Sequence, residues 1–205
     1  MNKVKRIVPY FIGALLVMMI FLVTLKVNSL YPFGNYDLAK HDAIRQYKPF
    51  LYSFIIGLKN GTIESFSFSN ALGNPTIFNY LYYLSSPINF VCLLFNNPDQ
   101  MYFMVILIKI IIASVTMHFY SYKKTDNHFI AIICSLCYVF SSWFLANYFH
   151  IMWLDAFMMF PLLQYGLEEL IHKNKVKVYI ISLVYIMISN FYMAFIICLY
   201  VFIYY

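Results

Sequence analysis

The side chains best suited to chemistry in this sequence lie in one stretch, from Tyr31 to Tyr47 and its immediate surroundings. Carboxylate, imidazole and basic groups follow one another closely there: Asp37, Lys40, His41, Asp42, Arg45 and Lys48. Such groups can exchange protons and bind anions such as phosphate. We therefore expect this stretch to hold the functional site, and the rest of the chain to position it.

The composition indicates that the positioning elements are membrane helices. Of the 205 residues, 63% are hydrophobic, 21% are aromatic and only 11% are charged. A soluble domain carries about 25% charged residues, so the composition excludes a soluble globular protein. The net charge of +6 could suggest a nucleic acid partner, but Lys and Arg in a membrane protein mainly mark cytoplasmic loops. We expect no nucleic acid partner.

Five apolar runs are long enough to cross a bilayer, which takes about 20 apolar residues per helix. They cover residues 7–26, 101–120, 129–149, 151–171 and 178–205, and a long loop at 28–98 separates the first two. The sequence thus predicts an all-α, polytopic integral membrane protein that forms a single membrane domain, residues 1–205.

The distribution of basic residues predicts the orientation of these spans. The amino terminus and the turns at 121–128 and 172–177 carry clusters of Lys and Arg, whereas the turn at 147–152 carries none. Because cytoplasmic loops are enriched in Lys and Arg, we expect a cytoplasmic amino terminus. The long loop and the 147–152 turn then lie outside.

Apolar residues recur at helical spacing from Ile44 to Leu58, with polar and charged residues between them. This pattern predicts a helix that lies in the membrane interface and bends at Pro49. Asp42 would stand at the start of this helix, and Asp is a preferred N-cap residue. Capping is therefore a structural alternative for Asp42, compatible with a catalytic role. A second apolar stretch, 79–95, is either a re-entrant or a surface helix.

Short motifs then follow in an order that resembles a known family, the bacterial YfhO membrane proteins. These motifs are Tyr31-Pro-Phe-Gly34, Asp42 with Gln46-Tyr47, Phe66-Ser-Phe-Ser69, Leu72-Gly73, Tyr82-Tyr-Leu-Ser-Ser-Pro-Ile-Asn89, His150-Ile-Met-Trp-Leu-Asp155, Pro161-Leu-Leu-Gln-Tyr-Gly166 and Ser189-Asn-Phe-Tyr192. The resemblance covers nearly the whole chain. Since members of the family are longer, we expect this chain to be the amino-terminal part of a longer protein.

The family is similar to C-type glycosyltransferases, so the resemblance implies a membrane glycosyltransferase in the bacterial cytoplasmic membrane. It would move a sugar from a polyprenyl-phosphate carrier to an envelope polymer, such as lipoteichoic acid, on the outer face. By position, Asp42 matches the acidic residue in the first outer loop of such enzymes, and Asp37 is the less well-placed alternative. Asp42 would take the proton from the attacking hydroxyl. The substrate would contact His41, Arg45, Gln46 and Lys48.

Polar residues in and beside the later spans add further candidates. Asp155 could act as a second catalytic carboxylate, hold a divalent cation or pair with Lys109. Lys109 lies near the middle of its span, where it needs a buried partner or a lipid phosphate. His150, at the outer boundary, is a candidate for substrate binding. The five histidines show no metal-ligand spacing, so no metal site and no cofactor beyond that cation is expected.

Two other functions stay open from the sequence. A transporter or flippase would place Lys109, Asp155 and Asn190 along a pathway through the membrane. A non-catalytic, truncated homologue is the third option. The concentration of polar residues at the predicted outer face favours an enzyme that works at the interface.

Overall fold

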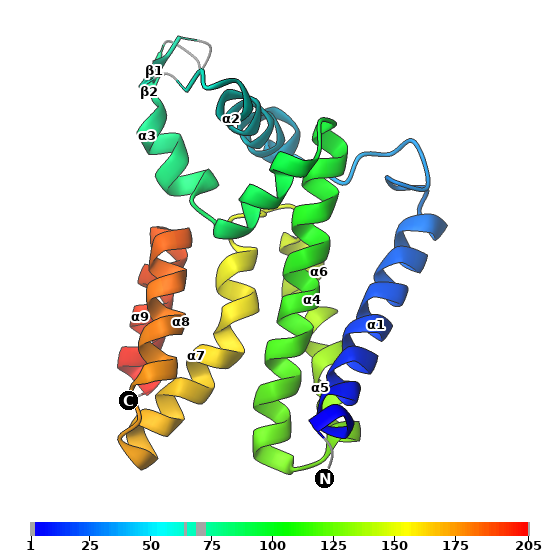
Figure 1. Ribbon diagram of the computed structural model, residues 1–205, viewed down its shortest axis with the longest axis vertical. Coiled ribbons are helices and arrows are strands. Elements are labelled where there is room, and N and C mark those ends of the chain that lie inside the picture. The colour runs from blue at the N-terminus through cyan, green and yellow to red at the C-terminus, as the bar shows by residue number, and fades with distance from the viewer. Residues whose placement is uncertain (1–2, 64, 69–72, 205) are drawn as a thin grey trace.

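The computed structural model describes residues 3–63, 65–68 and 73–204. Over these residues the chain is almost entirely helical, as predicted, apart from a ladder of two short antiparallel strands, β1 (Phe66–Ser67) and β2 (Asn74–Pro75). Figure 1 shows a bundle of helices whose end opposite the amino terminus is covered by α2 and this ladder. Ser69 and Leu72, which belong to the family motifs, lie outside the described residues.

The long loop begins and ends where the sequence predicts. Helix α1 (Lys3–Val27) precedes it and helix α4 (Pro98–Thr125) follows it. The start of α4 is encoded locally: the side chain of Asn97 accepts hydrogen bonds from the backbone N–H groups of Asp99 and Gln100. Pro98 suits the first helical turn because the N–H it lacks would have no partner inside the helix.

Three helices of the described chain are long and apolar enough to span a membrane: Ile7–Val27, Pro98–Thr125 and His128–Asn147. The last consists of α5 (His128–Val139) and α6 (Ser142–Asn147). A bent pair, Thr76–Leu84 with Pro87–Leu94, gives a fourth candidate. The predicted run at 151–171 forms α7 (Leu154–Lys173), which is not among the candidates. The polytopic class is confirmed, with three to four candidate spans instead of about five.

The prediction of one continuous span over 178–205 is wrong. This segment forms two short helices, α8 (Lys177–Ser189) and α9 (Phe191–Tyr204), separated by the extended backbone of Asn190. Asn190 donates its side-chain N–H to the carbonyl of Tyr82 at 2.8 Å and accepts from the backbone N–H of Met193 at 2.9 Å. These bonds stabilise the break, so α9 starts anew and returns beside α8 (Figure 1).

The stretch at 79–95 belongs to the bent pair. It comprises α3 (Thr76–Asn79), a π-helical turn η2 (Tyr80–Leu84) and a 3-10 helix η3 (Pro87–Leu94), with a bend of 99° at Ser85 and Ser86. Ser85 donates to the carbonyl of Ser189 at 2.8 Å, and Ser86 donates to Asp155 at 2.7 Å. The apex of the bend is therefore bonded to the bundle, which satisfies polar groups that a lipid environment could not.

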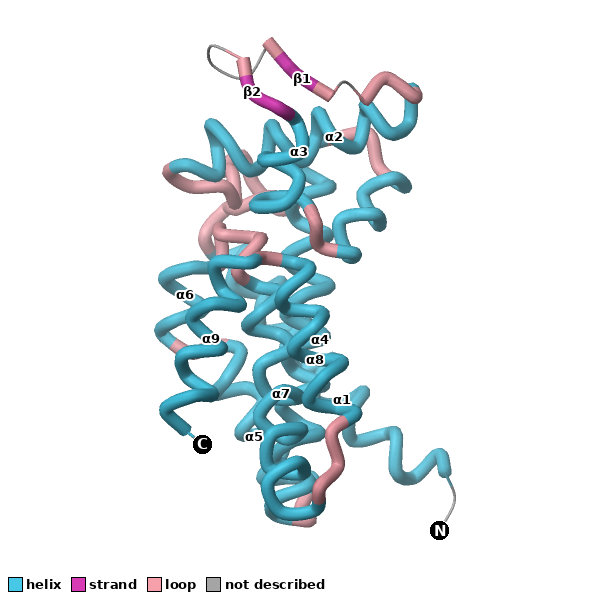
Figure 2. Tube along the Cα trace, turned by 90° about the vertical axis from the view of Figure 1, so that its left-hand side faces the viewer, coloured by secondary structure: helices cyan, strands magenta, loops and turns pink. Residues whose placement is uncertain are grey.

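The helix predicted between Ile44 and Leu58 is confirmed as a π-helical turn η1 (Ala43–Tyr47) that continues into α2 (Lys48–Asn60). Pro49 falls in the first turn of α2, and the helix ends at Gly61, whose φ of 66° favours glycine. Figures 1 and 2 show α2 crossing the end of the bundle instead of running along it. This is the arrangement expected of a helix at a membrane surface.

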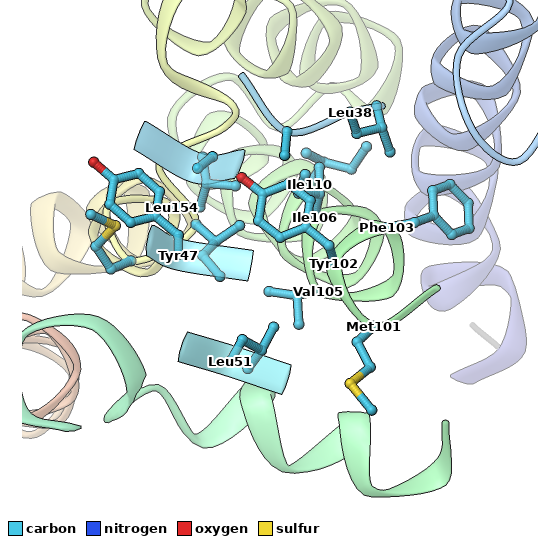
Figure 3. Close-up of a cluster of buried hydrophobic side chains, with 14 of the residues drawn as sticks. Leu38, Tyr47, Leu51, Met101, Tyr102, Phe103, Val105, Ile106, Ile110 and Leu154 are labelled. Atoms are coloured by element: carbon cyan, nitrogen blue, oxygen red, sulfur yellow. The ribbon is translucent and has the colours of Figure 1, made fainter. Parts of the chain in front are cut away.

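The hydrophobic core lies where the long loop meets the bundle. Figure 3 shows Tyr47 and Leu51 beside Met101, Tyr102 and Val105 of α4. Each large apolar side chain buried in this way contributes about 1.5–3 kcal/mol. The loop is thus packed firmly onto α4, and the residues that precede Tyr47 are held against the bundle with it.

The two ends of the bundle separate the connections as the sequence predicts. The start of α1, the α4–α5 turn and the α7–α8 turn lie at one end, whereas the long loop and the α6–α7 turn lie at the other (Figure 1). The assignment of the first end to the cytoplasm stays a prediction from the basic residues. Below, the second end is called the loop end.

Candidate functional site

Lys48 holds the long loop against the start of α4. Its ammonium group forms an ion pair with Asp37 at 2.5 Å and another with Asp99. Asp37 also accepts a hydrogen bond from the backbone N–H of Ala39 at 2.8 Å. Lys48 was predicted to contact substrate, and the structure instead engages it with two carboxylates. The same contacts occupy Asp37, the second choice for the catalytic base.

Asp42 is exposed and differs from the other described carboxylates at this end of the bundle. Among the described residues it has no hydrogen-bond partner and no ion pair, and its side chain does not cap the helix that begins at Ala43. His41 before it adopts a left-handed backbone, with φ of 49°, which turns the chain just ahead of η1. The capping alternative is therefore not realised, and the Asp42 carboxylate is available to a substrate.

The α6–α7 turn brings His150 to the same place, more than 100 residues further along the chain. Its Nδ1 lies 3.2 Å from the hydroxyl of Tyr47, and the ring of His41 lies 5.5 Å from that of Phe149. Two predicted residues, His41 and His150, thus meet Asp42 around the start of η1. Arg45 is exposed beside them.

Two tyrosines, Tyr47 and Tyr83, complete this cluster; both lie in the family motifs, but the sequence did not predict them as site residues. The hydroxyl of Tyr83 donates to Gln46 at 3.4 Å, and the ring of Tyr83 lies 5.5 Å from that of Tyr47. Burial, followed by the Asp42 carboxylate, raises the pKa of Tyr47 to about 12. Tyr47 therefore stays protonated at neutral pH. The number of tyrosines in the chain hides both, since 20 tyrosines give no signal by type alone.

Helix α4 fixes the position of His150 through the backbone on both sides of it. The hydroxyl of Tyr102 donates to the carbonyl of Phe149, and the ammonium group of Lys109 donates to the carbonyl of Ile151 at 2.7 Å. Tyr102 and Lys109 are both about 1% exposed. The turn that carries His150 therefore rests on two buried polar side chains of one rigid helix.

Asp155 lies in a closed network instead of an open site. It pairs with Lys109 at 2.5 Å, and its other oxygen accepts from Ser86 at 2.7 Å and from Tyr185 at 3.0 Å. The side chain is fully buried, with 0% exposed. This is the ion pair that the sequence offered as one alternative, and Lys109 occupies the place that a cation would take. The described residues contain no cluster of three or more potential metal ligands.

The pKa of His150 provides a test of this geometry. Burial lowers the pKa of His150 below its ordinary value of 6.5, while Asp42 opposes this shift and His41 adds to it. The imidazole is then neutral at pH 7. The depressed pKa of His150 contributes to the stability of the folded protein above the pKa that this side chain has in the unfolded chain. That contribution is lost as the pH falls through the lower pKa of the folded state.

We expect Asp42→Asn to lower the pKa of His150 further, because the substitution removes the anion that favours the imidazolium form. An NMR titration of labelled histidines in the detergent-solubilised protein measures this shift. Asp37→Asn is the control and should leave the titration of His150 unchanged. An identical His150 midpoint in wild type and Asp42→Asn would show that the two side chains do not interact.

The fold and this cluster define a polytopic helical membrane protein with a polar site at the loop end of its bundle. The model of the bacterial membrane protein YfhO family matches residues 11–205, and the chain belongs to that family. Comparisons with curated proteins and with solved structures gave no significant match.

Proposed function

We propose that this protein is a membrane glycosyltransferase that moves a sugar from a polyprenyl-phosphate carrier to an envelope polymer at the outer face. The observation that carries the proposal is the state of Asp42. It is exposed at the loop end, while Asp37, Asp99 and Asp155 are each bound to a lysine. Of the described carboxylates in this region, Asp42 is the one free to act as a base.

The proposed reaction uses the cluster around Asp42. An acceptor hydroxyl attacks the anomeric carbon, a new C–O bond forms, and the bond to the carrier phosphate breaks with its electron pair left on the phosphate. Asp42 takes the proton of the hydroxyl. His41 and the exposed Arg45 are the nearby groups able to bind the departing phosphate.

The rival function, transport of a lipid-linked component, has less support from the contacts inside the bundle. A pathway residue needs access to its cargo, whereas Lys109 and Asp155 neutralise each other and are almost fully buried. Asn190 is likewise committed to Tyr82 and to the start of α9. These contacts are structural, which favours an enzyme that works at the interface over a transporter.

The experiment that tests the proposal supplies a radiolabelled polyprenyl-phosphate hexose to membranes that contain the intact protein. We expect the label to move to lipoteichoic acid, with polyprenyl phosphate released in equal amount. Membranes without the protein are the control. Movement of the intact donor across the bilayer, with its glycosidic bond unbroken, would support the transporter instead, and no protein-dependent change in the donor would contradict both.

A further inference from the structure

A pocket of about 380 Å³ opens at the loop end, between α2, the β-ladder and α3. Figure 2 shows these elements stacked at the end of the molecule away from both termini. The volume falls in the range of small-molecule sites, about 300–1,000 Å³. The pocket is separate from the Asp42 cluster, because neither Asp42 nor His150 lines it.

The chemistry of the pocket wall indicates a neutral ligand rich in hydroxyl groups. None of the twelve lining residues in the described part of the chain is charged. Aromatic rings come from Phe50, Tyr52 and Phe54, and hydroxyl groups come from Ser53 and Thr76, among others. A sugar ring presents C–H faces that pack on aromatic rings and hydroxyls that pair with polar side chains. A phosphate would call for Arg or Lys.

A hydrocarbon chain fits the same wall poorly. It would cover the hydroxyl groups without offering them a hydrogen bond, and buried polar groups left unpaired are costly. Two of the three walls agree with this argument, because α2 and the β-ladder lie across the end of the bundle, beyond the three long candidate spans (Figure 1). The third wall, α3 and η2, belongs to the bent pair.

One residue joins the pocket to the Asp42 cluster. Phe50 lines the pocket, and its ring lies 5.4 Å from that of Tyr83. Tyr83 in turn contacts Tyr47 and donates to Gln46. Phe50 in the pocket wall and Tyr83 in the cluster therefore connect the two places through one ring contact.

We propose that the pocket between α2, β1 and α3 is a subsite for a neutral sugar ring, linked to the Asp42 cluster through Phe50 and Tyr83. The inference rests on the proposed glycosyltransferase function and assigns a place to one of its sugars. The sugar belongs either to the donor or to the acceptor polymer, and both present the same neutral, hydroxylated ring.

The test measures sugar binding directly, by saturation-transfer NMR on the protein in nanodiscs, with methyl glucoside and methyl N-acetylglucosaminide as probes. The Asp42→Asn protein is included because it still has the pocket. We expect equal binding in wild type and Asp42→Asn. This readout does not depend on turnover, so the subsite and the proposed reaction can fail separately.

Gly57 offers the substitution that fills the pocket. A Cβ atom at Gly57 would lie 3.5 Å from Ile63, an ordinary contact, so alanine fits and a leucine side chain extends into the space. We expect Gly57→Leu to abolish the sugar signal, while Asn60→Leu, which adds the same side chain on the same helix outside the pocket, preserves it. The double variant Ser53→Ala/Thr76→Val should weaken sugar binding about tenfold, because two hydrogen bonds are lost. If Gly57→Leu fails to fold, this double variant tests whether the sugar binds in the pocket.

A competition experiment shows whether the bound sugar belongs to the donor or to the acceptor. A methyl glycoside that competes with the polymer in the transfer assay identifies an acceptor subsite, and one that competes with the lipid-linked sugar identifies a donor subsite. Sugar binding that persists in both the Gly57→Leu and the Ser53→Ala/Thr76→Val proteins would overturn the proposal. So would saturation of farnesol signals, lost in Gly57→Leu, in place of sugar signals.

Discussion

Asp42→Asn is expected to lower the rate of sugar transfer by about two to four orders of magnitude, the usual contribution of a general base. Asparagine has the same shape but cannot take up a proton at neutral pH. The loss should appear in the maximal rate at saturating donor, because the amide keeps the hydrogen-bonding surface of the site. Transfer of a radiolabelled sugar in membranes measures it.

The structure separates this effect from a loss of folding. Asp42 caps no helix and bonds to no described side chain, so the thermal midpoint of Asp42→Asn should match that of wild type. Asp37→Asn is the matched control, since it alters a nearby aspartate whose role is to pair with Lys48. We expect the control to keep most of its transfer rate. Full activity in Asp42→Asn, with activity lost in Asp37→Asn, would move the catalytic role to Asp37.

Lys109→Met should produce the largest loss of stability of any single substitution considered, about 3–5 kcal/mol. Methionine fills a similar volume but leaves the carboxylate of Asp155 without its positive partner, at a site that is 0% exposed. The substitution also releases the carbonyl of Ile151 next to His150. Thermal unfolding in detergent, followed by the loss of the monomer peak on size exclusion, measures the effect.

The double substitution Lys109→Met with Asp155→Leu distinguishes a structural role for the pair from a catalytic one. Replacing both charges by apolar groups is often neutral for stability, so the double variant should recover most of the loss. We also expect it to retain sugar transfer, because Asp155 is bonded within the bundle and does not reach the Asp42 cluster. A folded but inactive double variant would show that the Lys109–Asp155 pair is needed for the reaction, either directly or through the position of His150.

Several features of the molecule could be read from local signals alone. The boundaries of the long loop follow from the apolar run that ends α1 and from the Asn97-Pro98 start of α4. The helix after Asp42 follows from its apolar spacing, because one face has to be buried on the bundle. The alternation of basic and uncharged turns likewise predicted which connections share an end (Figure 1).

Other features depend on partners that are remote in sequence. Asn190 is one polar residue in a long apolar run, so the hydropathy averaged over the run does not reveal a break there. In the structure it bonds to Tyr82 and to the start of the next helix. Lys48 was expected to contact substrate because a lysine near an acidic stretch suits either a phosphate or a carboxylate. In the structure Lys48 pairs with Asp37 and with Asp99, and Asp99 is 51 residues away along the chain.

The sequence by itself determined the membrane class, the limits of the loop and the position of Asp42 in the charged stretch of that loop, because these depend on composition and on neighbours along the chain. Only the tertiary structure decided which carboxylates are occupied and which residues surround the free one. Lys48 and Lys109 neutralise Asp37, Asp99 and Asp155, while His150 and Tyr83 come from distant parts of the chain to contact Tyr47 and Gln46 in the helix that begins after Asp42. The physical reason is that the availability of a charged group depends on what is packed against it in space.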